Sequence, residues 1–446
     1  MRPSLYVIVI THKLILTILA MLGAIFRKSI PAVVANATVA RSSVMATRAM
    51  SSKVDLFNPT SEHKDLRHMV AKFTKEEIEP QALEFNRDEK FNMDLFKKVG
   101  DLGLLGITVN EEYGGTGLDA TAAVIVHEEM SASDPAFTLS YLAHSMLFAN
   151  NLNFNGSAEQ CAKYLPEACT GEKIGAMGMS EPSVGTDVLG MKTKAVRDGD
   201  HYVINGSKMW ITNGAVSDSE LGDYFLIYAR TSEDKVKGVS FFLLEKGMEG
   251  FSLGQRIKDK CGMRASYTAE LVFDNVKVPV ENRVGEEGDA VLHMMRNLEL
   301  ERLVLAAMSL GIARRSIEVM VNYAKERHSF GKPLSSYGQI QKMIGDSWAE
   351  YQAGRAYVYN TASNLNLGVA GNRIDSDGVK LFCGDMGKRV ADRAMQCLGG
   401  YGYVGDYVVE RLWRDAKLLE IGGGTNEAHQ KNMTGDICKL NQFPWV

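Results

Sequence analysis

The stretch HYVINGSKMWITNG at residues 201–214 opens the part of the chain that decides its fold. Three further runs rich in Val, Phe, Leu and Tyr follow it: DYFLIYARTS (223–232), KGVSFFLLEKG (237–247) and TAELVFDNVKVP (268–279). Gly, Asn, Asp and Pro separate these runs, which is typical of short β-strands joined by turns. Because no helical pattern lies between them, the sequence predicts a small antiparallel barrel or sandwich and not a parallel dinucleotide-binding sheet.

Helical periodicity lies on both sides of this β-rich region. Apolar residues recur at spacings of three and four from Ser61 to about Gly171, with an interruption at the loop EEYGGTGLD (111–119). The same spacing returns near Asp289 and continues to about Thr434. The sequence therefore predicts an α+β protein with a leader at residues 1–54, a helical domain at 55–173, a β-barrel domain at 174–286 and a second helical domain at 287–446.

The first 54 residues contain seven Lys or Arg residues and no Asp or Glu. Arginine spaced among Ala, Ser, Val and Met is typical of a mitochondrial transit peptide. We therefore expect a location in the mitochondrial matrix and a mature start between Ala46 and Val54. The alternative is a membrane anchor over Leu5–Phe26, but Lys13 near its centre would cost about 2.5–3.5 kcal/mol on insertion. We expect no stable membrane insertion, and Met21 is an alternative start.

The remainder of the chain is acidic, with 43 basic and 54 acidic residues and a net charge of −11. Such a body would repel a phosphate backbone, so we expect no nucleic-acid partner. The six cysteines form no CxxC pair, and we interpret them as buried, reduced thiols without a metal site or a disulfide. Gly400, Gly402 and Gly405 match GxGxxG by letter, but a helical segment precedes them, which argues against a Rossmann fingerprint.

Two short motifs carry groups that suit a planar heterocycle. In MSEPSVGTD (179–187), Ser180 and Thr186 offer hydroxyl groups, and glycine allows the backbone to come close to a ligand. In MWITNG (209–214), Trp210 offers a flat face next to the hydroxyl group of Thr212. Taken singly, the first motif is more often a plain turn and the second a core tryptophan. Their occurrence together at this spacing favours a binding site.

These motifs resemble the flavin-contacting signatures of the acyl-CoA dehydrogenase family, and the order of helices, sheet and helices is similar to that family's fold. The resemblance runs from about Phe57 to Leu440 and includes RHSFGKPL (327–334), QCLGGYGY (396–403) and GTNE (424–427). It is nearest to the isovaleryl-CoA branch. It implies an N-terminal helical bundle, a middle antiparallel β-barrel and a C-terminal four-helix bundle.

The resemblance also implies FAD as cofactor, a homotetramer and electron-transfer flavoprotein as the electron acceptor. Arg327 would meet the FAD, because a forked cation suits a pyrophosphate. The turn Gln396–Gly400 would contact the dinucleotide of a neighbouring subunit. In one departure, Gly338 stands where the family usually has Gln, and Gln339 comes one place late. The expected FAD contacts are Met177, Met179, Ser180, Thr186, Trp210, Ile211, Thr212, Arg327, Gln339, Gln396, Cys397, Leu398, Gly399, Gly400, Thr425, Asn426 and Glu427.

Oxidation of an acyl-CoA requires a carboxylate at the α-carbon while hydride leaves the β-carbon, and a raised pKa in a dry pocket suits this base. Most relatives carry the Glu immediately before the Gly-Thr of the late loop, but the loop IGGGTNE (421–427) has Gly423 at that place. The isovaleryl-CoA and long-chain branches carry the base on the helix that opens the last domain. The matching segment here is RNLELERLVLAA (296–307).

Helical spacing separates two candidates on this segment. Glu299 has arginines as neighbours, so we expect it to be exposed and partly ion-paired. Glu301 lies on an apolar face, where an unpaired carboxylate is costly unless it has a function. The other members of that face are Met294, Leu298, Leu305 and Met308. We therefore expect Glu301 to be the catalytic base, and the alternative is a structural Glu neutralised by an arginine.

The resemblance implies substrate contacts as well. Ser180 and Thr186 would lie near the thioester and pantetheine, and Arg302 near the CoA moiety. The backbone N–H beside the base and a flavin ribitol hydroxyl would hold the thioester oxygen. Leu292 stands where the isovaleryl branch tends to have Tyr, which leaves the exact substrate open. The expected substrate contacts are Ser180, Thr186, Glu299, Leu300, Arg302, Gly423 and Gly424.

The predicted function is FAD-dependent α,β-dehydrogenation of a short branched acyl-CoA, with isovaleryl-CoA oxidised to 3-methylcrotonyl-CoA in leucine breakdown. Gly423 would leave volume for the branched chain. Three alternatives stay open: a different chain specificity, an oxidase that passes electrons to O₂, and a non-catalytic flavoprotein that serves as a binding or assembly module. The intact MSEP and WIT motifs and Glu301 argue against the last.

Overall fold

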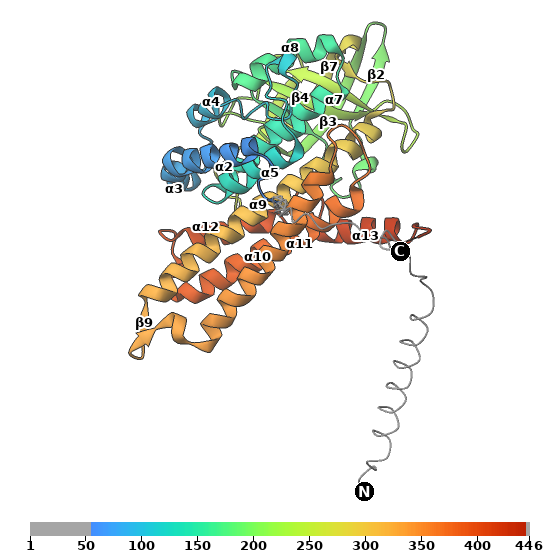
Figure 1. Ribbon diagram of the computed structural model, residues 1–446. Coiled ribbons are helices and arrows are strands. Elements are labelled where there is room, and N and C mark those ends of the chain that lie inside the picture. The colour runs from blue at the N-terminus through green and yellow to red at the C-terminus, as the bar shows by residue number, and fades with distance from the viewer. Residues whose placement is uncertain (1–54, 443–446) are drawn as a thin grey trace, which may run out of the picture. The chain divides into compact units, whose positions relative to one another are not determined.

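The structure, a computed structural model, describes residues 55–442. The predicted leader, with the alternative anchor Leu5–Phe26, lies outside the described residues. None of the helices between residues 55 and 442 is long and apolar enough to cross a membrane. These residues belong to one unit, Val54–Val446, in which helices come first, a curved sheet second and further helices last (Figure 1).

The first part of this unit is helical, and polar side chains begin several of its helices. The side chains of Thr60, Asn92, Asp119 and Asp134 each accept a hydrogen bond from a backbone N–H of the first turn. Such caps satisfy N–H groups that a helix leaves without a partner. The elements are α2 (Ser61–Phe73), η1 (Thr74–Ile78), α3 (Glu79–Asp88), α4 (Met93–Asp101), η2 (Glu111–Tyr113), α5 (Ala120–Ser131), α6 (Pro135–Leu142), η3 (Ala143–Asn150), α7 (Asn151–Asn155) and α8 (Ala158–Thr170).

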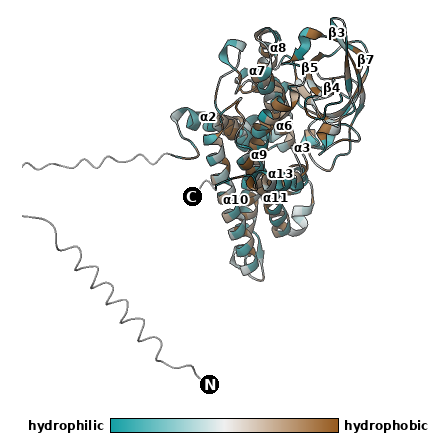
Figure 2. Ribbon diagram, turned by 90° about the vertical axis from the view of Figure 1, so that its right-hand side faces the viewer, coloured by the Kyte–Doolittle hydropathy of each residue, from teal (hydrophilic) through white to brown (hydrophobic). Residues whose placement is uncertain are grey.

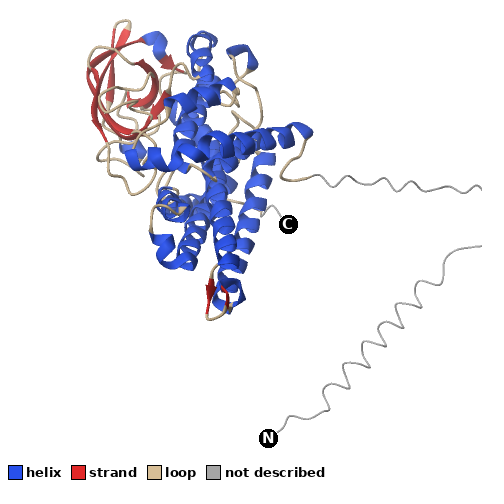
Figure 3. Ribbon diagram, turned by 90° about the vertical axis from the view of Figure 1, so that its left-hand side faces the viewer, coloured by secondary structure: helices blue, strands red, loops and turns tan. Residues whose placement is uncertain are grey.

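An eight-stranded sheet follows, and Figure 3 shows its strands curving into a barrel-like ring. The strands are β1 (Gly175–Gly178), β2 (Lys194–Asp198), β3 (His201–Thr212), β4 (Tyr224–Arg230), β5 (Val239–Glu245), β6 (Phe251–Arg256), β7 (Thr268–Pro279) and β8 (Arg283–Val284). Their order is β6-β7-β3-β2-β4-β5-β8, with β1 paired to β4. The predicted antiparallel pairing is confirmed for most of the sheet, but β1 and β2 run parallel to β4. The long connection from β1 to β4, which carries β2 and β3, makes the parallel pairing possible.

Strands β4 and β5 are buried along almost their whole length, so both of their faces are covered, and Figure 2 colours the residues of the sheet by hydropathy. Successive side chains of a strand point to opposite faces, and those of β4 enter two different cores. Phe225 and Ile227 pack inside the barrel, whereas Leu226 and Tyr228 pack against the helices, in a cluster that includes Met294. The second face of β4 therefore lies against the region where the candidate base is found.

The last part of the unit is a helical bundle built on one long helix. Its elements are α9 (Ala290–Glu326), β9 (His328–Ser329), β10 (Lys332–Pro333), η6 (Leu334–Ser336), α10 (Gly338–Asn364), α11 (Arg373–Leu398), η7 (Gly399–Tyr403), α12 (Val408–Leu418) and α13 (Asn426–Ile437), with η4 (Val188–Gly190) and η5 (Val280–Asn282) lying earlier in the chain. Helix α9 packs on α10 and α11 and also contacts α5, η3 and β5. The glycines of GxGxxG follow helix α11, so a Rossmann fingerprint is excluded.

Buried charges join the first helices to the bundle. Glu128 on α5 is fully buried, and its carboxylate accepts hydrogen bonds from Arg67 of α2 at 3.0 Å and from Arg355 of α10 at 3.1 Å. Tyr351 donates to the same carboxylate at 3.2 Å. Because removing one partner would leave a buried charge uncompensated, this cluster fixes α2, α5 and α10 relative to one another.

The environment of the cysteines differs from the prediction at two positions. Four cysteines are buried, but Cys261 and Cys438 are exposed. Cys261 lies in the connection between β6 and β7, and Cys438 follows the last turn of α13. The expectation of buried thiols was wrong for these two, because both fall in connecting segments that run over the surface.

Candidate active site

Glu301 lies on α9 at the place where the helix passes between the sheet and the bundle. The residue is 7% exposed, and its Oε2 atom has no hydrogen-bond partner among the described residues. Burial raises the pKa of its carboxyl group from 4.5 to about 7, although the nearby cations Arg302 and Lys380 act in the opposite direction. A carboxyl group in this state can take up a proton near neutral pH, as a general base requires.

Glu299, the rejected candidate, is buried and not exposed, so that part of the prediction was wrong. It is 4% exposed, and its carboxylate accepts hydrogen bonds from the backbone N–H groups of Gly371 and Asn372 at 2.8–3.2 Å. The loop before α11 covers this side of α9, a long-range contact that helical spacing does not reveal. The two glutamates differ in their partners: Glu299 anchors a loop, whereas Glu301 keeps an oxygen free.

The loop that begins after α12 brings Gly423 next to Glu301. A Cβ atom at Gly423 would lie 3.5 Å from Oε1 of Glu301 and would overlap with Cδ1 of Leu305. The backbone of Gly423 has φ +67°, a conformation that glycine adopts without a steric penalty. The two places that the sequence offered for the base therefore adjoin the same space.

The structure brings the MSEP and MWIT motifs together. The backbone N–H of Met209 donates to the carbonyl oxygen of Ser180 at 2.9 Å. Trp210 has φ +68° at a bulge of β3, and its side chain is 61% exposed. An exposed indole on a strained backbone is uncommon and points to a functional surface. Its flat face next to the 180–186 loop fits a planar heterocycle.

A buried ion pair that the sequence analysis did not single out fixes the 180–186 loop. Lys208 on β3 is fully buried, and its Nζ atom donates to Oε1 of Glu181 at 2.9 Å and to the carbonyl oxygen of Met179 at 3.0 Å. Burial lowers the pKa of Lys208 to about 8, while Glu181 acts to raise it. The available signal was a lysine inside the predicted strand 201–214, directly before the MWITNG motif.

The other expected cofactor contacts lie elsewhere in the chain. Arg327, Gln339, Gln396, Gly399 and Gly400 are exposed. Arg327 precedes β9, and Figure 1 shows β9 at the end of the bundle remote from the sheet. Arg327 shares a surface pocket with residues of α9 and the segment after α11, among them Arg315, Tyr323, Tyr401 and Tyr407. The chain therefore carries two separate groups of expected contacts.

Several expected contacts are placed so that only their backbone can meet a ligand. Ile211, Cys397 and Leu398 are at most 5% exposed and belong to the cores of the sheet and the bundle.

The remaining expected contacts differ in exposure. Met179 is mostly buried, and Met177, Ser180 and Thr212 are half-buried, whereas Thr186 is exposed. Thr425 caps helix α13, since its hydroxyl accepts from the N–H of Ala428 at 3.2 Å. Asn426 is half-buried and Glu427 is exposed on the first turn.

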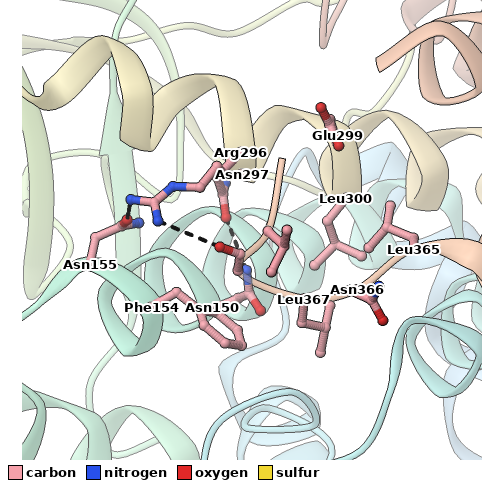
Figure 4. Close-up of a pocket in the computed structure, with 12 residues that line it drawn as sticks. Asn150, Phe154, Asn155, Arg296, Asn297, Glu299, Leu300, Leu365, Asn366 and Leu367 are labelled. Carbon is pink, nitrogen blue, oxygen red and sulfur yellow. Dashed lines mark hydrogen bonds between the residues drawn. The ribbon is translucent and has the colours of Figure 1, made fainter. Parts of the chain in front are cut away.

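A polar pocket lies beside α9, one turn before Glu301 (Figure 4). Arg296 donates to Oδ1 of Asn155 at 2.7 Å, and Asn150 donates to Oδ1 of Asn297 at 3.0 Å. The lining comprises Asn150, Phe154, Asn155, Arg296, Asn297, Glu299, Leu300, Leu365, Asn366, Leu367, Gly368 and Val369. Two of the expected substrate contacts, Glu299 and Leu300, lie here, but Glu301 is not part of the lining.

Arg302, expected near the CoA moiety, forms an ion pair inside the protein. The residue is 9% exposed, and its Nη1 atom lies 3.0 Å from Oδ1 of the fully buried Asp377 of α11. Its guanidinium therefore reaches into the bundle. Any influence of Arg302 on a bound CoA is expected to be indirect.

Family models of three domains match consecutive parts of this chain. The N-terminal domain of acyl-CoA dehydrogenase matches residues 60–172, the middle domain residues 176–276 and the C-terminal domain residues 291–436. These matches cover most of the chain, in the order in which helices, sheet and bundle occur. The chain belongs to the acyl-CoA dehydrogenase family. It is thus an oxidoreductase that acts on CH–CH groups, and the family-level prediction is confirmed.

Individual acyl-CoA dehydrogenases are similar to the chain over most of their length. The mitochondrial isovaleryl-CoA dehydrogenase of Oryza sativa subsp. japonica is 44% identical over 399 residues, 89% of this chain and 95% of that protein. The short-chain specific acyl-CoA dehydrogenase of Clostridium acetobutylicum is 41% identical over 86% of this chain and 100% of that protein. The structure of butyryl-CoA dehydrogenase from Megasphaera elsdenii superposes with a TM-score of 0.81 at 34% identity, covering 85% of this chain and 99% of that chain. These dehydrogenases differ in their named substrates, so similarity alone does not select one.

Proposed function

We propose that this acyl-CoA dehydrogenase uses FAD to oxidise a short branched acyl-CoA, converting isovaleryl-CoA to 3-methylcrotonyl-CoA, with Glu301 as the α-proton base. One observation carries the proposal: the buried carboxylate of Glu301, with one oxygen that has no hydrogen-bond partner among the described residues, lies beside Gly423. By the family resemblance, Gly423 stands where most relatives carry their base. Glu301 thus supplies a carboxylate beside Gly423, and a second carboxylate in the late loop is not needed for the proposed proton transfer.

The residues of the chain fit a flavin at the sheet. Trp210 offers an exposed flat face, and the half-buried Ser180 and Thr212 offer hydroxyl groups beside it. Lys208 and Glu181 keep this loop in one conformation. When bound, FAD supplies the hydride acceptor for the β-carbon. The fully buried anchor means that the loop is ordered before ligand binds, which lowers the cost of binding.

Glu301 performs the proton transfer in this proposal. Its free carboxylate oxygen takes the α-proton of the acyl chain, and burial makes this carboxylate more basic than an exposed one. The surrounding apolar side chains, Met294, Leu298 and Leu305, exclude water from it. As the family resemblance implies, a backbone N–H beside the base and a flavin ribitol hydroxyl would hold the thioester oxygen and so acidify the α-C–H bond.

Gly423 supports a branched substrate. Glycine adds no side chain next to the carboxylate that would act on the α-carbon, and Cδ1 of Leu305 occupies the place that a Cβ atom at residue 423 would take. A methyl branch at the β-carbon needs room near the base. The similarity to an isovaleryl-CoA dehydrogenase at 44% identity points in the same direction.

The separation of the two groups of expected FAD contacts supports an oligomer. Trp210 lies at the sheet, whereas Arg327 lies near the remote end of the bundle (Figure 1). A single dinucleotide that meets both groups would have to lie between two subunits, with Arg327 and the Gln396–Gly400 turn supplied by a neighbour. We include a homotetramer in the proposal, with electron-transfer flavoprotein as acceptor and the mitochondrial matrix as location, as the mitochondrial relatives suggest.

A second candidate function is the oxidation of a straight short chain. The relative named short-chain specific is 41% identical, only slightly less similar than the isovaleryl-CoA relatives. Leu292, where the isovaleryl branch tends to have Tyr, is 54% exposed and therefore does not help to shape a buried acyl pocket. The acyl preference must be measured.

Anaerobic mixing of the FAD-loaded enzyme with a set of acyl-CoA esters tests the proposal. We expect isovaleryl-CoA to bleach the flavin absorbance band faster than butyryl-CoA or a long-chain ester, because Gly423 adds no side chain beside the proposed base. Faster bleaching by butyryl-CoA would favour the straight-chain candidate. A flavin band that no ester bleaches would favour a non-catalytic binding module, and oxygen consumption without an added acceptor would identify an oxidase.

The rate of flavin reduction should also depend on pH. Only ionised Glu301 can accept a proton, and burial places its pKa at about 7. The rate with isovaleryl-CoA should therefore fall about tenfold per pH unit below that value and level off above it. Stopped-flow rates between pH 5.5 and 9 measure this limb, and a rate that stays constant down to pH 5.5 would contradict the assignment of a base with a raised pKa.

A further inference from the structure

Two buried side chains donate hydrogen bonds to one carbonyl group of the glycine loop. Nζ of Lys380, on α11, donates to the carbonyl oxygen of Gly424 at 3.0 Å. Nε2 of His429, on α13, donates to the same oxygen at 3.0 Å. Lys380 and His429 both have 0% exposure. Neither residue belongs to the motifs that connect the chain to its cofactor or its substrate.

His429 has a polar partner at each ring nitrogen. Its Nδ1 atom lies 2.6 Å from Oδ1 of Asp377, and its Nε2 atom faces a carbonyl oxygen. Both partners are acceptors, but a neutral imidazole has only one N–H group. Burial lowers the pKa of His429, although the carboxylate of Asp377 acts to raise it, so a neutral ring donates to only one of the two acceptors at a time. Arg302 lies 3.0 Å from the same oxygen of Asp377, so this acidic side chain links the cluster to α9.

The loop needs such an anchor because of its own composition. Residues 422–424 are three successive glycines, and Gly423 and Gly424 have φ values of +67° and +99°. Glycine loses more conformational freedom on folding than any other residue, so an unsupported loop of this kind would sample many conformations. A Cβ atom at Gly424 would lie 2.8 Å from Cε1 of His429, which shows how closely the ring approaches the loop.

The charge of Lys380 in this cluster also acts on the carboxylate of Glu301. The cations that lower the pKa of Glu301 are Arg302 on α9 itself and Lys380 on α11. On the sheet side, burial and, to a smaller extent, the charge of Glu301 raise the pKa of Tyr228 on β4. Lys380 thus touches the loop through a hydrogen bond and acts on Glu301 through its charge.

We propose that Asp377, Lys380 and His429 are positioning residues that hold the carbonyl group of Gly424 and so keep Gly423 beside Glu301. The inference rests on the proposed role of Glu301. Lys380 and His429 fix the loop directly, and Asp377 orients His429 and Arg302. The three side chains come from two helices, α11 and α13, so they also couple the position of the loop to the packing of the bundle.

Lys380→Met in the FAD-loaded enzyme separates this role from a merely structural one. Removing a cation near a carboxylate raises the pKa of that carboxylate by about one unit or more. We expect the acid limb of flavin reduction by isovaleryl-CoA to move about one pH unit upward, with a loss of about tenfold near pH 7 and a much smaller loss above pH 9. Lys388→Met, a half-buried lysine two turns further along α11, is the matched control and should keep the wild-type limb.

His429 is tested through its hydrogen bond. His429→Gln keeps a donor that can reach the carbonyl oxygen of Gly424, whereas His429→Ala removes it. We expect His429→Ala to raise the KM for isovaleryl-CoA and to lower kcat by about tenfold or more, because small displacements in an active site are costly in rate. His429→Gln should recover most of the loss. Equal activity of these two variants with the wild type would overturn the proposal for His429.

Two further outcomes keep the test decisive. If Lys380→Met does not retain FAD, Lys380→Gln replaces it, since a glutamine keeps a donor but removes the charge, and the limb should still move. An unshifted acid limb in a lysine variant that retains FAD would overturn the role of Lys380. Failure of the proposed function looks different, because the wild-type flavin would then remain unbleached by every acyl-CoA ester.

Discussion

Glu301→Gln is expected to lower the rate of flavin reduction by a factor of about 10²–10⁴, the usual contribution of a general base. Glutamine has nearly the shape of glutamate but cannot accept the α-proton. FAD content and the oligomeric state should stay unchanged, because Glu301 has no hydrogen-bonded partner through its Oε2 atom among the described residues. Steady-state turnover with an artificial electron acceptor and isovaleryl-CoA measures the loss.

Glu299→Gln is the matched control, since it changes a second buried carboxylate on the same helix. Glu299 accepts backbone N–H groups of Gly371 and Asn372, and the carbonyl oxygen of a glutamine can still accept one of them. This variant should lose stability but little of the chemical step. Equal turnover of the two variants would refute the assignment of the base.

The thermal stability of Glu301→Gln shows whether a loss of activity comes from lost chemistry or from lost structure. Folding raises the pKa of Glu301 from 4.5 to about 7, so the folded state favours the protonated form. That contribution to stability is complete below pH 4.5 and is lost as the pH rises through about 7. Above pH 7 the variant should therefore unfold at the same or a higher temperature than the wild type, which separates lost chemistry from lost structure.

Moving the base to the late loop is expected to change both the rate and the substrate preference. Glu301→Gly alone should lose about 10²–10⁴ in flavin reduction, as expected for removal of a general base. Adding Gly423→Glu places a carboxylate next to the same space, since a Cβ atom there lies 3.5 Å from Oε1 of Glu301. The new side chain would overlap with Leu305, so Leu305→Ala must accompany the change.

The recovery should be partial and should favour straight chains. A glutamate at φ +67° costs about 1–2 kcal/mol in backbone conformation, and a misplacement of about an ångström can cost ~10²-fold in rate. The new side chain also fills volume that a β-methyl branch would occupy. We therefore expect the triple variant to regain at least about tenfold with butyryl-CoA and less with isovaleryl-CoA.

The control for this exchange is Glu301→Gly with Leu305→Ala, which enlarges the site without adding a base. It should remain inactive with both esters. No recovery in a triple variant that binds FAD would mean that residue 423 does not face the reacting carbon, and the argument from Gly423 to a branched substrate would then be lost.

The sequence predicted the order of helices, sheet and helices because each part has its own periodicity. Short β-rich runs separated by turn residues marked β3, β4, β5 and β7, and spacings of three and four marked the helices on either side. Glu301 was selected for the same reason, since its neighbours on α9 are apolar; the structure buries Met294, Leu305 and Met308 and half-buries Leu298. The parallel pairing of β1 with β4 was not predictable, because local patterns do not show which distant strands meet.

The misjudged residues are those whose environment comes from distant parts of the chain. Glu299 looked exposed from its helical neighbours, but the loop at Gly371 and Asn372 covers it. Lys380 and His429 stand on different helices and meet at Gly424 only in the folded chain. Such contacts follow from tertiary packing and leave no short-range signal.

A crystal structure of the FAD-loaded Glu301→Gln variant with isovaleryl-CoA tests the central claim most directly, because the substrate would stay unreacted. The account predicts that the side chain at position 301 lies within van der Waals distance of the α-carbon, about 3–3.5 Å, and that the methyl branch lies over Gly423. A carboxylate at the α-carbon in place of the residue 301 side chain, such as that of Glu420 or Glu427, would contradict it.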